Sequence, residues 1–479
     1  MLDARDMTDF EGHNPIPLGN RDCVPRPGRV PRPVIIIALV AVGAAALIAG
    51  EMLVGNVIVW IALGLALAAL LLSFPEVCLG LFLTAGTYKS ELAGVLNVET
   101  DPTVLLGGLL LAGVAVRVLR RGVRPLTPPR QVILPFALLV LVMAFSVLSD
   151  TAGEYGRQKF LRFALLTGVA TVAAYATIQS TPALKRFLAT AIVLGVMMTA
   201  LGTVAGEGLS AFGATHIATG RIIGLALLGV LFMLLAVRRQ PLFRLALLGL
   251  AGLLAFGFLS SGSRGSMVAL LATLAVTALA SFTLKRGRRW VAAGLILMAA
   301  VGAVSSMLVP SATETMNRRV VEVIASPSAI GSARGREQRA QDALALFYEH
   351  PWTGVGVGGF DMARGYGDAA RGDYAHNILL EIACELGVLG LAAFLGLVVP
   401  ALRSTVRALR QVRTKEEFAT AAVVFATTIY FLVNAMFSGD LNDNRLLFAA
   451  LGLCAALPRM ARARPATPDA KRPAKGDGQ

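Results

Sequence analysis

The feature that most limits the fold is an apolar run of about 20 residues that recurs along the whole chain. A helix needs about 20 predominantly apolar residues to cross the hydrocarbon core of a bilayer. Fourteen runs begin near Pro33, Val54, Glu76, Thr103, Val132, Phe163, Phe187, Ile222, Leu242, Met267, Val291, Ile378, Ala419 and Leu446. Because the run from Glu76 to Thr87 is short, the sequence predicts 12 to 14 membrane crossings.

Composition agrees with this pattern. The chain is 56% apolar and 15% charged, whereas soluble domains are about 45–50% apolar and about 25% charged. These values exclude an ordinary water-soluble globule, and four cysteines are too few for a disulfide framework. Cys78, Cys384 and Cys454 lie in apolar runs, where we expect them to act as small hydrophobic residues. The expected fold class is an all-α, polytopic integral membrane protein.

The formal net charge of +15 is explained by membrane orientation. Short cytoplasmic loops of membrane proteins carry an excess of Lys and Arg. If the N-terminus is cytoplasmic and every run crosses, the inside segments hold 30 of the 44 Lys and Arg residues. These segments are the two tails, the loop 117–130, Lys185 with Arg186, and the loops 238–244, 285–289 and 403–415. We therefore expect two cytoplasmic termini and no nucleic-acid partner.

This topology divides the chain into five parts. They are a disordered cytoplasmic tail over 1–32, transmembrane helices 1 to 11 over 33–310, one large outer loop with short helices over 311–377, transmembrane helices 12 to 14 over 378–458, and a disordered cytoplasmic tail over 459–479. The inner loops are too short for a soluble catalytic domain, and no Walker A or H-E-x-x-H motif occurs. Chemistry is therefore expected at the outer face.

The outer loop contains two local signals. Residues Arg336 to Tyr348 form an amphipathic pattern that predicts a helix, which His350-Pro351 ends. The stretch 354–359 then satisfies G-x-G-x-x-G. A dinucleotide site would need a βαβ unit around it and a nucleotide at the outer face. A tight turn with close backbone approach is the favoured interpretation.

Several arginines lie on the outer side, which should be poor in basic residues. Arg264 lies in a tight outer turn, and Arg334, Arg336 and Arg339 fall within two turns of the expected helix. Snorkelling to headgroups or a solvated basic face are the alternative interpretations. An arginine cluster on this side nevertheless favours an anionic partner, and guanidinium groups suit phosphates.

The start of the run at Ile378 carries the other candidates. His376 has an ordinary pKa of about 6.5 and could accept a proton near neutral pH, although a lone interfacial histidine is often structural. Glu381 and Glu385 share one face of the following helix, where packing or pairing with arginine is favoured over a catalytic role. Asp440, in the last outer turn, could orient the histidine or pair with an arginine.

These residues together resemble a known family. The pattern consists of Ser263-Arg264-Gly265, Arg336 with Ala340, Ala343-Leu344, Glu349 to Gly356, Phe360, His376-Asn377 and Glu385 to Gly390. As a set it looks like the signature of the O-antigen ligase and polymerase superfamily, and the resemblance covers most of the chain after Gln158. Ala340 departs from the pattern, because the family usually has Trp there; this removes a packing aromatic and no proposed chemistry.

The resemblance implies a membrane glycosyltransferase of the C type. Such enzymes take a glycan from an undecaprenyl-diphosphate carrier at the periplasmic face of the bacterial inner membrane. The acceptor is lipid A core, another carrier-linked glycan or a protein. By this resemblance Arg264 and Arg336 contact the diphosphate, with Arg339 in reserve and Arg162 similar to a third family arginine. His376 then serves as catalytic base, with Asp440 as its candidate partner.

The expected reaction is an inverting, metal-independent displacement without a cofactor. The diphosphate is itself a good leaving group, no Asp-x-Asp motif occurs, and the outer histidines His216, His350 and His376 are far apart in sequence. An O-antigen or exopolysaccharide polymerase of the same superfamily is the first alternative. A lipid-linked glycan flippase or transporter is the second, although the paired repeats and interrupted helices common in carriers are not evident.

Overall fold

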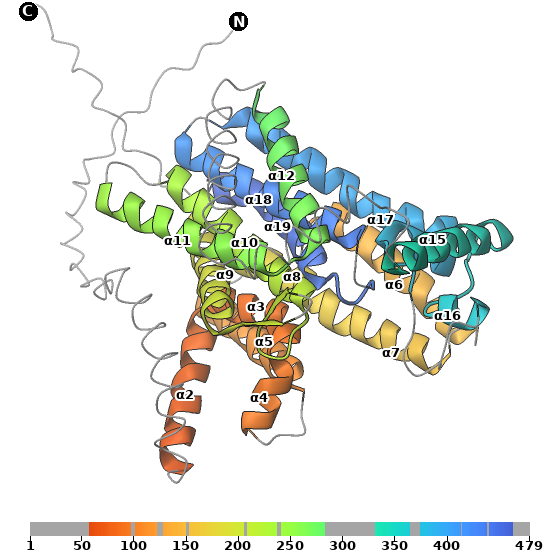
Figure 1. Ribbon diagram of the computed structural model, residues 1–479, viewed down its shortest axis with the longest axis horizontal. Helices are drawn as coiled ribbons and strands as arrows, with labels where there is room; N and C mark the ends of the chain where they lie inside the picture. Colours follow the sequence, from red (N-terminus) through yellow and green to blue (C-terminus); the bar gives the residue numbers. More distant parts are fainter. Residues whose placement is uncertain are drawn as a thin grey trace, which may run out of the picture. The chain divides into compact units, whose positions relative to one another are not determined.

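The computed structural model describes residues 57–96, 101–121, 128–149, 153–205, 208–236, 241–282, 331–364, 374–412, 414–437 and 440–462. Most of these residues lie in helices (Figure 1). This confirms the predicted all-α fold class. The mostly apolar helices form a multi-pass membrane bundle.

The helices have the following bounds. They are α2 (Val57–Ser73), α3 (Pro75–Thr84), α4 (Lys89–Leu96), α5 (Pro102–Arg121), α6 (Arg130–Leu148), α7 (Glu154–Arg162), α8 (Gly168–Thr177), α9 (Thr181–Leu201), α10 (His216–Ala236), α11 (Pro241–Ser260), α12 (Arg264–Phe282), α15 (Gly331–Glu349), α16 (Gly359–Arg364), α17 (Ile378–Gln411), α18 (Lys415–Ala435) and α19 (Arg445–Arg462). A 3-10 helix, η1 (Ala85–Thr87), follows α3, and a π-helical turn, η2 (Phe163–Thr167), joins α7 to α8. The strands β1 (Thr203–Ala205) and β2 (Gly208–Ser210) pair antiparallel, with Thr203 opposite Ser210. This small ribbon was not predicted, because three-residue strands leave no readable alternation.

Eight helical segments of the described chain are long and apolar enough to cross a membrane. They are Pro102–Leu119, Arg130–Leu148, Glu154–Thr177, Thr181–Leu201, His216–Ala236, Pro241–Ser260, Ile378–Gln411 and Lys415–Ala435. Each coincides with a predicted run, and α12 and α19 occupy two further runs. The runs that begin near Pro33 and Val291 lie outside the described residues.

The weak run from Glu76 to Thr87 forms a bent element rather than a straight crossing. The helical segments Gly64–Ser73 and Pro75–Thr87 are bent by 110° relative to each other. Together they form a broken span or a re-entrant loop. Pro75 is the first residue of α3, and Phe74 before it has non-helical angles (φ −126°, ψ 70°). Proline tolerates the first helical position but disfavours helix at the residue before it, which explains the break.

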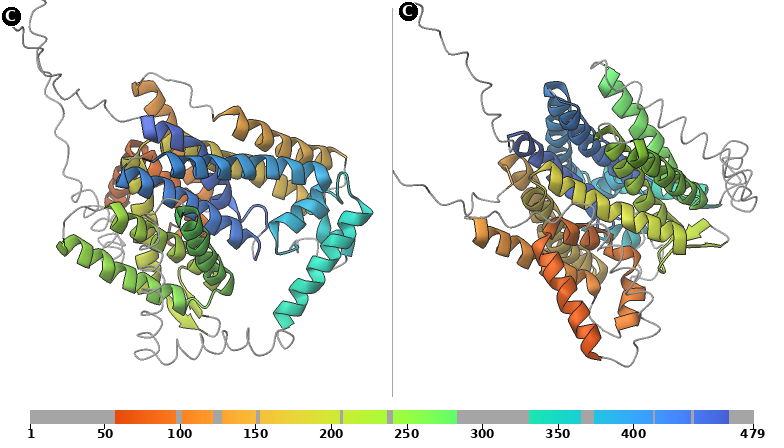
Figure 2. Two further views of the ribbon diagram at one scale, coloured as in Figure 1. Left: turned by 90° about the horizontal axis from the view of Figure 1, so that it is seen from above. Right: turned by 90° about the vertical axis from the view of Figure 1, so that its left-hand side faces the viewer.

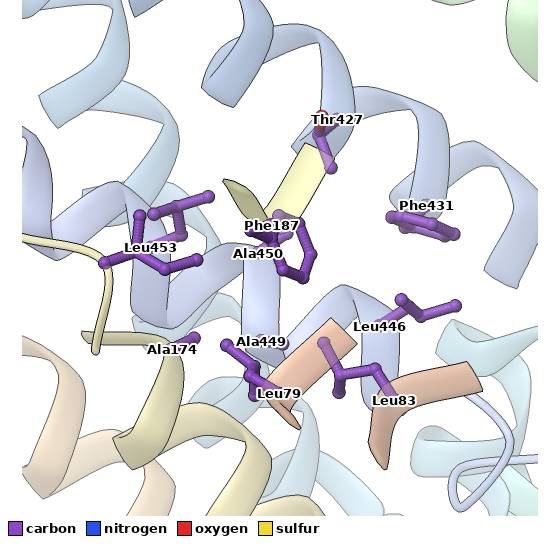
Figure 3. A pocket seen from close by; sticks show the side chains of 11 residues that line it. Leu79, Leu83, Ala174, Phe187, Thr427, Phe431, Leu446, Ala449, Ala450 and Leu453 are labelled. Carbon is purple, nitrogen blue, oxygen red and sulfur yellow. The ribbon is translucent and has the colours of Figure 1, made fainter. Parts of the chain in front are cut away.

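The core is close-packed where the central helices meet. Phe163 in η2 stacks on Phe136 of α6, with ring centroids 5.5 Å apart, and meets Phe448 of α19 at 5.1 Å. Figure 3 shows a further apolar contact region, where side chains such as Leu79, Phe187 and Leu453 converge. The void between them is only about 10 Å³, which is space for about one water molecule. This region of the bundle is therefore packing and not a ligand site.

The glycine-rich stretch docks onto a kink in α17. Gly387 interrupts α17 with a left-handed φ of 64°, and Gly354 has a φ of 69°. A Cβ at Gly354 would lie 2.2 Å from the carbonyl carbon of Glu385, so only glycine fits there. The amide of Val355 donates to the carbonyl of Cys384 at 2.9 Å. These contacts confirm the turn interpretation, and helices rather than strands flank the stretch within residues 331–364.

Candidate active site

The start of α17 fixes the position of His376. The Asn377 side chain accepts hydrogen bonds from the amides of Leu379 (2.9 Å) and Leu380 (3.3 Å), which caps the helix. His376 itself has a left-handed φ of 54°, an uncommon conformation for a residue with a side chain. Its half-buried ring lies 4.3 Å from the ring of Tyr374, centroid to centroid. The sharp turn and the cap together orient the histidine.

Helix α15 connects the arginines of the predicted outer loop to this turn. Ala343 and Leu346 of α15 are buried in one small cluster with Ala375, the residue before the histidine. Arg336 and Arg339 continue the same helical stripe, because their spacing to Ala343 is seven and four residues. Arg336 is exposed, whereas Arg339 is half-buried and donates to its own helix backbone at 3.2 Å. Figure 1 and the left view of Figure 2 show α15 beside the first turns of α17.

Arg264 is the first residue of α12 and lies beside the end of α18. The Ser266 hydroxyl donates to the Asn434 side-chain oxygen of α18 at 3.0 Å. Gly265 faces Phe437, and a Cβ at Gly265 would lie 3.1 Å from the Phe437 Cβ. Arg264 is half-buried at this junction. The turn that carries it is therefore held by polar and close apolar contacts to the segment that leads into the last outer turn.

Asp440 is buried at the beginning of that last turn. Its Oδ2 accepts a hydrogen bond from the Tyr155 hydroxyl of α7 at 2.8 Å, and its Oδ1 accepts from the Asp443 amide at 2.9 Å. The Asn444 side chain also donates to the Asp440 carbonyl at 2.7 Å. These bonds tie the turn to α7. A direct role for Asp440 toward His376 stays a prediction.

A buried ion cluster of three side chains joins α7 to α17 next to this turn. Lys159 Nζ lies 2.6 Å from Glu381 Oε1 and 2.8 Å from Glu385 Oε2. All three side chains are at most 1% exposed. Glu381 Oε1 also accepts from the Leu441 amide at 2.9 Å. Helix packing or pairing with an arginine was predicted for the two glutamates. Instead they pair with Lys159, which α7 presents to α17.

Tyr374 shows which charges surround the histidine. Burial raises the pKa of the Tyr374 phenol to about 12. The negative charges of Asp443, Asp440 and Glu381 contribute to this raised pKa, and the positive charge of Arg221 lowers it. Because these groups act on the ring that contacts the histidine ring, the start of α17, the turn that begins at Asp440 and the start of α10 form one electrostatic neighbourhood.

Sequence reasoning missed two arginines of this neighbourhood. Arg221 of α10 interacts electrostatically with Asp443 and Tyr374. Arg445, the first residue of α19, interacts with Asp443, Asp440 and the exposed Arg162 at the end of α7. Both Arg221 and Arg445 come directly before an apolar run on the predicted outer side. The argument that selected the other outer arginines would have found them.

The arrangement combines a histidine with several guanidinium groups on neighbouring helices. Such a site can hold an anion and accept a proton from a neutral group. Arg334 belongs to α15, but its side chain lies outside the described residues. Among the described residues, no group of three or more His, Cys, Asp or Glu side chains could hold a metal ion.

Comparison with known proteins finds one similarity, in the segment that carries most of the candidate site. Residues 249–395 match a family model described as O-Antigen ligase. The matched segment includes Arg264, Arg336, Arg339 and His376, together with the loop that docks onto α17. No curated protein matches the chain. The match covers about a third of the chain and supports the resemblance to the O-antigen ligase superfamily.

Proposed function

We propose that the protein transfers a glycan from an undecaprenyl-diphosphate carrier to an acceptor, in the manner of an O-antigen ligase. One observation carries the proposal. The family-matched segment contains both an arginine-bearing helix and a histidine turn, and these two elements share the cluster of Ala343, Leu346 and Ala375. A cationic surface next to a proton acceptor suits transfer from a diphosphate donor.

We further propose a periplasmic active site in the bacterial inner membrane, with both termini cytoplasmic. The distribution of Lys and Arg residues supports this orientation. Apart from Arg336 and Arg339 of α15, the residues of the site lie near the N-terminal ends of the apolar segments that begin with α7, α10, α12, α17 and α19. In an alternating topology these five ends fall on the same side, which is the side predicted to be poor in basic residues.

In the proposed reaction His376 is the general base. It takes the proton from the acceptor hydroxyl while that oxygen attacks the anomeric carbon of the glycan. The bond between the anomeric carbon and the diphosphate oxygen breaks, and the configuration at the anomeric carbon inverts. Undecaprenyl diphosphate leaves with the bonding electron pair. Asp440 would help to orient the histidine through the surrounding turn.

The arginines stabilise the charge that develops on the departing diphosphate. Arg264 and Arg336 are the proposed contacts, with Arg339 and Arg162 as further donors. Guanidinium groups that are already in position act at no cost of reorganisation during the reaction. With this stabilisation the displacement proceeds without a metal ion or a cofactor, because the diphosphate is already a good leaving group.

Release of the carrier tests the function directly. Purified protein in detergent is mixed with an undecaprenyl-diphosphate-linked glycan and an acceptor, and free undecaprenyl diphosphate is measured. A transferase releases carrier with matching growth of the acceptor. A transporter has no compartments to connect in detergent, so the absence of release in the presence of a competent acceptor would contradict the proposal.

A deletion strain distinguishes the ligase from the polymerase. If the protein is a ligase, its deletion should leave the lipid A core without any transferred glycan. If it is a polymerase, the deletion should leave single repeat units on the core and no long chains. Gel electrophoresis of lipopolysaccharide reads both outcomes. Single-repeat caps would overturn the ligase assignment and keep the transferase.

A further inference from the structure

A second charged cluster lies at the opposite end of the same bundle. Arg117 Nη1 of α5 is 3.4 Å from Oε2 of Glu76 in α3, and Nε of Arg186 in α9 contacts Oε1 of the same glutamate. Arg117 Nη1 also donates to the carbonyl of Thr177 at 3.0 Å. The segment Glu154–Thr177 therefore has the candidate active site near its first residues and this second cluster at its last residue.

A cavity opens beside the cluster. It has a volume of about 310 Å³ and is lined by Leu72, Ser73, Phe74, Glu76, Val116, Arg117 and Arg186. It lies where α2 turns sharply away from α3 at the break before Pro75. Its volume is at the lower end of the range of about 300–1,000 Å³ that is usual for small-molecule sites.

The wall of the cavity carries a net positive charge. The single carboxylate, Glu76, is 2% exposed, whereas the side chains of Arg117 and Arg186 are 24% and 35% exposed. Arg117 contacts Glu76 through Nη1, and Arg186 contacts it through Nε. The Arg186 guanidinium also lies over the Phe74 ring, 5.5 Å from its centroid. Both cations are thus held in place at a solvent-accessible surface.

We propose that this cavity binds a phosphate group. Planar guanidinium groups pair with phosphate oxygens in a bidentate manner, and two of them meet here, with Glu76 as the one carboxylate among the described lining residues. Leu72 and Val116 add apolar surface next to the charges, which suits a phosphate that carries an acyl chain. Basic pockets between membrane helices bind anionic lipid headgroups in this way. Free phosphate offers the same group without the chain.

The site is independent of the proposed transfer reaction. Charge patterning predicts the cytoplasmic side for Arg117 and Arg186, whereas the carrier diphosphate would bind at the outer end. Loss of phosphate binding here and loss of glycan transfer are therefore separable results.

Native mass spectrometry of the full-length protein in detergent tests the proposal. The protein is titrated with phosphatidylglycerol, with the zwitterionic phosphatidylcholine, and separately with inorganic phosphate and pyrophosphate. The double variant R117Q/R186Q is expected to bind the anionic ligand about tenfold more weakly. The control R130Q/K185Q removes the same charge at two positions outside the described cavity lining, the exposed Arg130 and Lys185, whose side chain is 41% exposed. Its affinity should stay within about twofold of wild type.

The ligand series identifies the source of the phosphate. Binding of phosphatidylglycerol that depends on the two arginines indicates a lipid headgroup, and the same dependence for inorganic phosphate or pyrophosphate alone indicates a free anion. If neither ligand depends on Arg117 and Arg186, or if the control variant loses as much affinity, the proposal is wrong.

A second variant tests the proposal without changing either arginine, so the test does not depend on the double variant folding. Ser73 is exposed and lines the cavity, so Ser73→Trp fills the space and leaves both arginines unchanged. Phosphate or phosphatidylglycerol binding should fall by about tenfold in this variant as well. Full binding by a folded Ser73→Trp protein would overturn the placement of the ligand in this cavity.

Discussion

The two ion clusters of the bundle have opposite composition and opposite access to solvent. In one, Lys159 lies between Glu381 and Glu385, and all three side chains are at most 1% exposed. In the other, Glu76 lies between Arg117 and Arg186, both of which reach solvent beside a cavity. Both clusters join helices that are far apart in sequence. The first carries a formal charge of −1 and the second of +1.

The difference shows how access to solvent decides what an ion cluster can do. Removing charges from water is costly, and the attraction between them repays the cost only when every group is well paired. In the sealed cluster the Lys159 ammonium bonds to both glutamates and the Leu441 amide bonds to Glu381 Oε1, which joins α7, α17 and the turn after Asp440, although Glu381 Oε2 has no hydrogen-bond partner among the described residues. With all three side chains at most 1% exposed, the cluster offers no surface to a ligand. The open cluster has donors at a cavity wall and can receive one.

The largest effect is expected for Lys159→Met. This change leaves two adjacent buried carboxylates without their cation, which costs about 3–5 kcal/mol of stability. Thermal or denaturant unfolding in detergent, followed by tryptophan fluorescence or helical circular dichroism, measures it. Lys89→Met removes a lysine from an exposed pair and serves as the control. A Lys159→Met protein as stable as its control would show that the cluster is not sealed.

A smaller effect is expected when the loop 351–358, which docks on the backbone of Glu385, is displaced. A Cβ at Gly354 would collide with the backbone of Glu385. Gly354→Ala should therefore displace this loop from α17 and lower the free energy of unfolding by about 1–3 kcal/mol. Limited proteolysis should then cleave the loop 351–358 faster. Gly108→Ala is the control, because a Cβ there meets no atom within 4 Å. Equal cleavage rates in both variants would contradict the docked loop.

Glu76→Gln tests the open cluster. The substitution removes the carboxylate between two guanidinium groups, and because both reach solvent we expect a cost of only about 1–2 kcal/mol. Added phosphate should recover part of this loss, since an anion in the cavity would replace the missing charge. A loss as large as that of Lys159→Met, with no recovery by phosphate, would erase the distinction between the two clusters.

The smallest effect is expected at the exposed pair of Lys89 and Asp101, 3.4 Å apart. Burial tends to raise the pKa of Asp101, but hydrogen bonds from Thr103 and the charge of Lys89 lower it overall. With its pKa lowered in the folded protein, the ionised Asp101 carboxylate stabilises the fold. This contribution is fully present above the ordinary aspartate pKa of about 4 and is lost as the pH falls through the lowered pKa. Lys89→Ala should cost at most about 1 kcal/mol at neutral pH. A larger cost in unfolding measurements would contradict the exposure of this pair.

The sequence predicted the helical scaffold well, because the signal for a membrane helix is carried by each apolar run on its own. The turn at Gly354 was also readable, since its glycines allow a backbone approach that other residues do not. The partner of Glu381 and Glu385 was not readable. Lys159 is more than 200 residues away in the chain, and only the packing of α7 on α17 brings the charges together. In the sequence, the break at Phe74 showed only as an apolar run from Glu76 that is too short to cross a membrane.

The candidate site was predicted in part. Arg264 and His376 could be selected because they are polar residues next to apolar runs, and Arg336 because it belongs to an arginine cluster on the side predicted to be poor in basic residues. Their relative placement depends on tertiary contacts, such as that between Phe437 and Gly265, for which the sequence has no local signal. Arg221 and Arg445 satisfy the same local criterion and join the site through Asp443.

The rate of glycan transfer by His376→Ala tests the central claim most directly. Purified wild type, His376→Ala and the exposed control His350→Ala are compared under single-turnover conditions with a carrier-linked glycan and its acceptor. Loss of the general base should slow transfer by about 10²–10⁴-fold, with donor affinity nearly unchanged and the control close to wild type. A His376→Ala enzyme that transfers glycan at the wild-type rate would contradict the account.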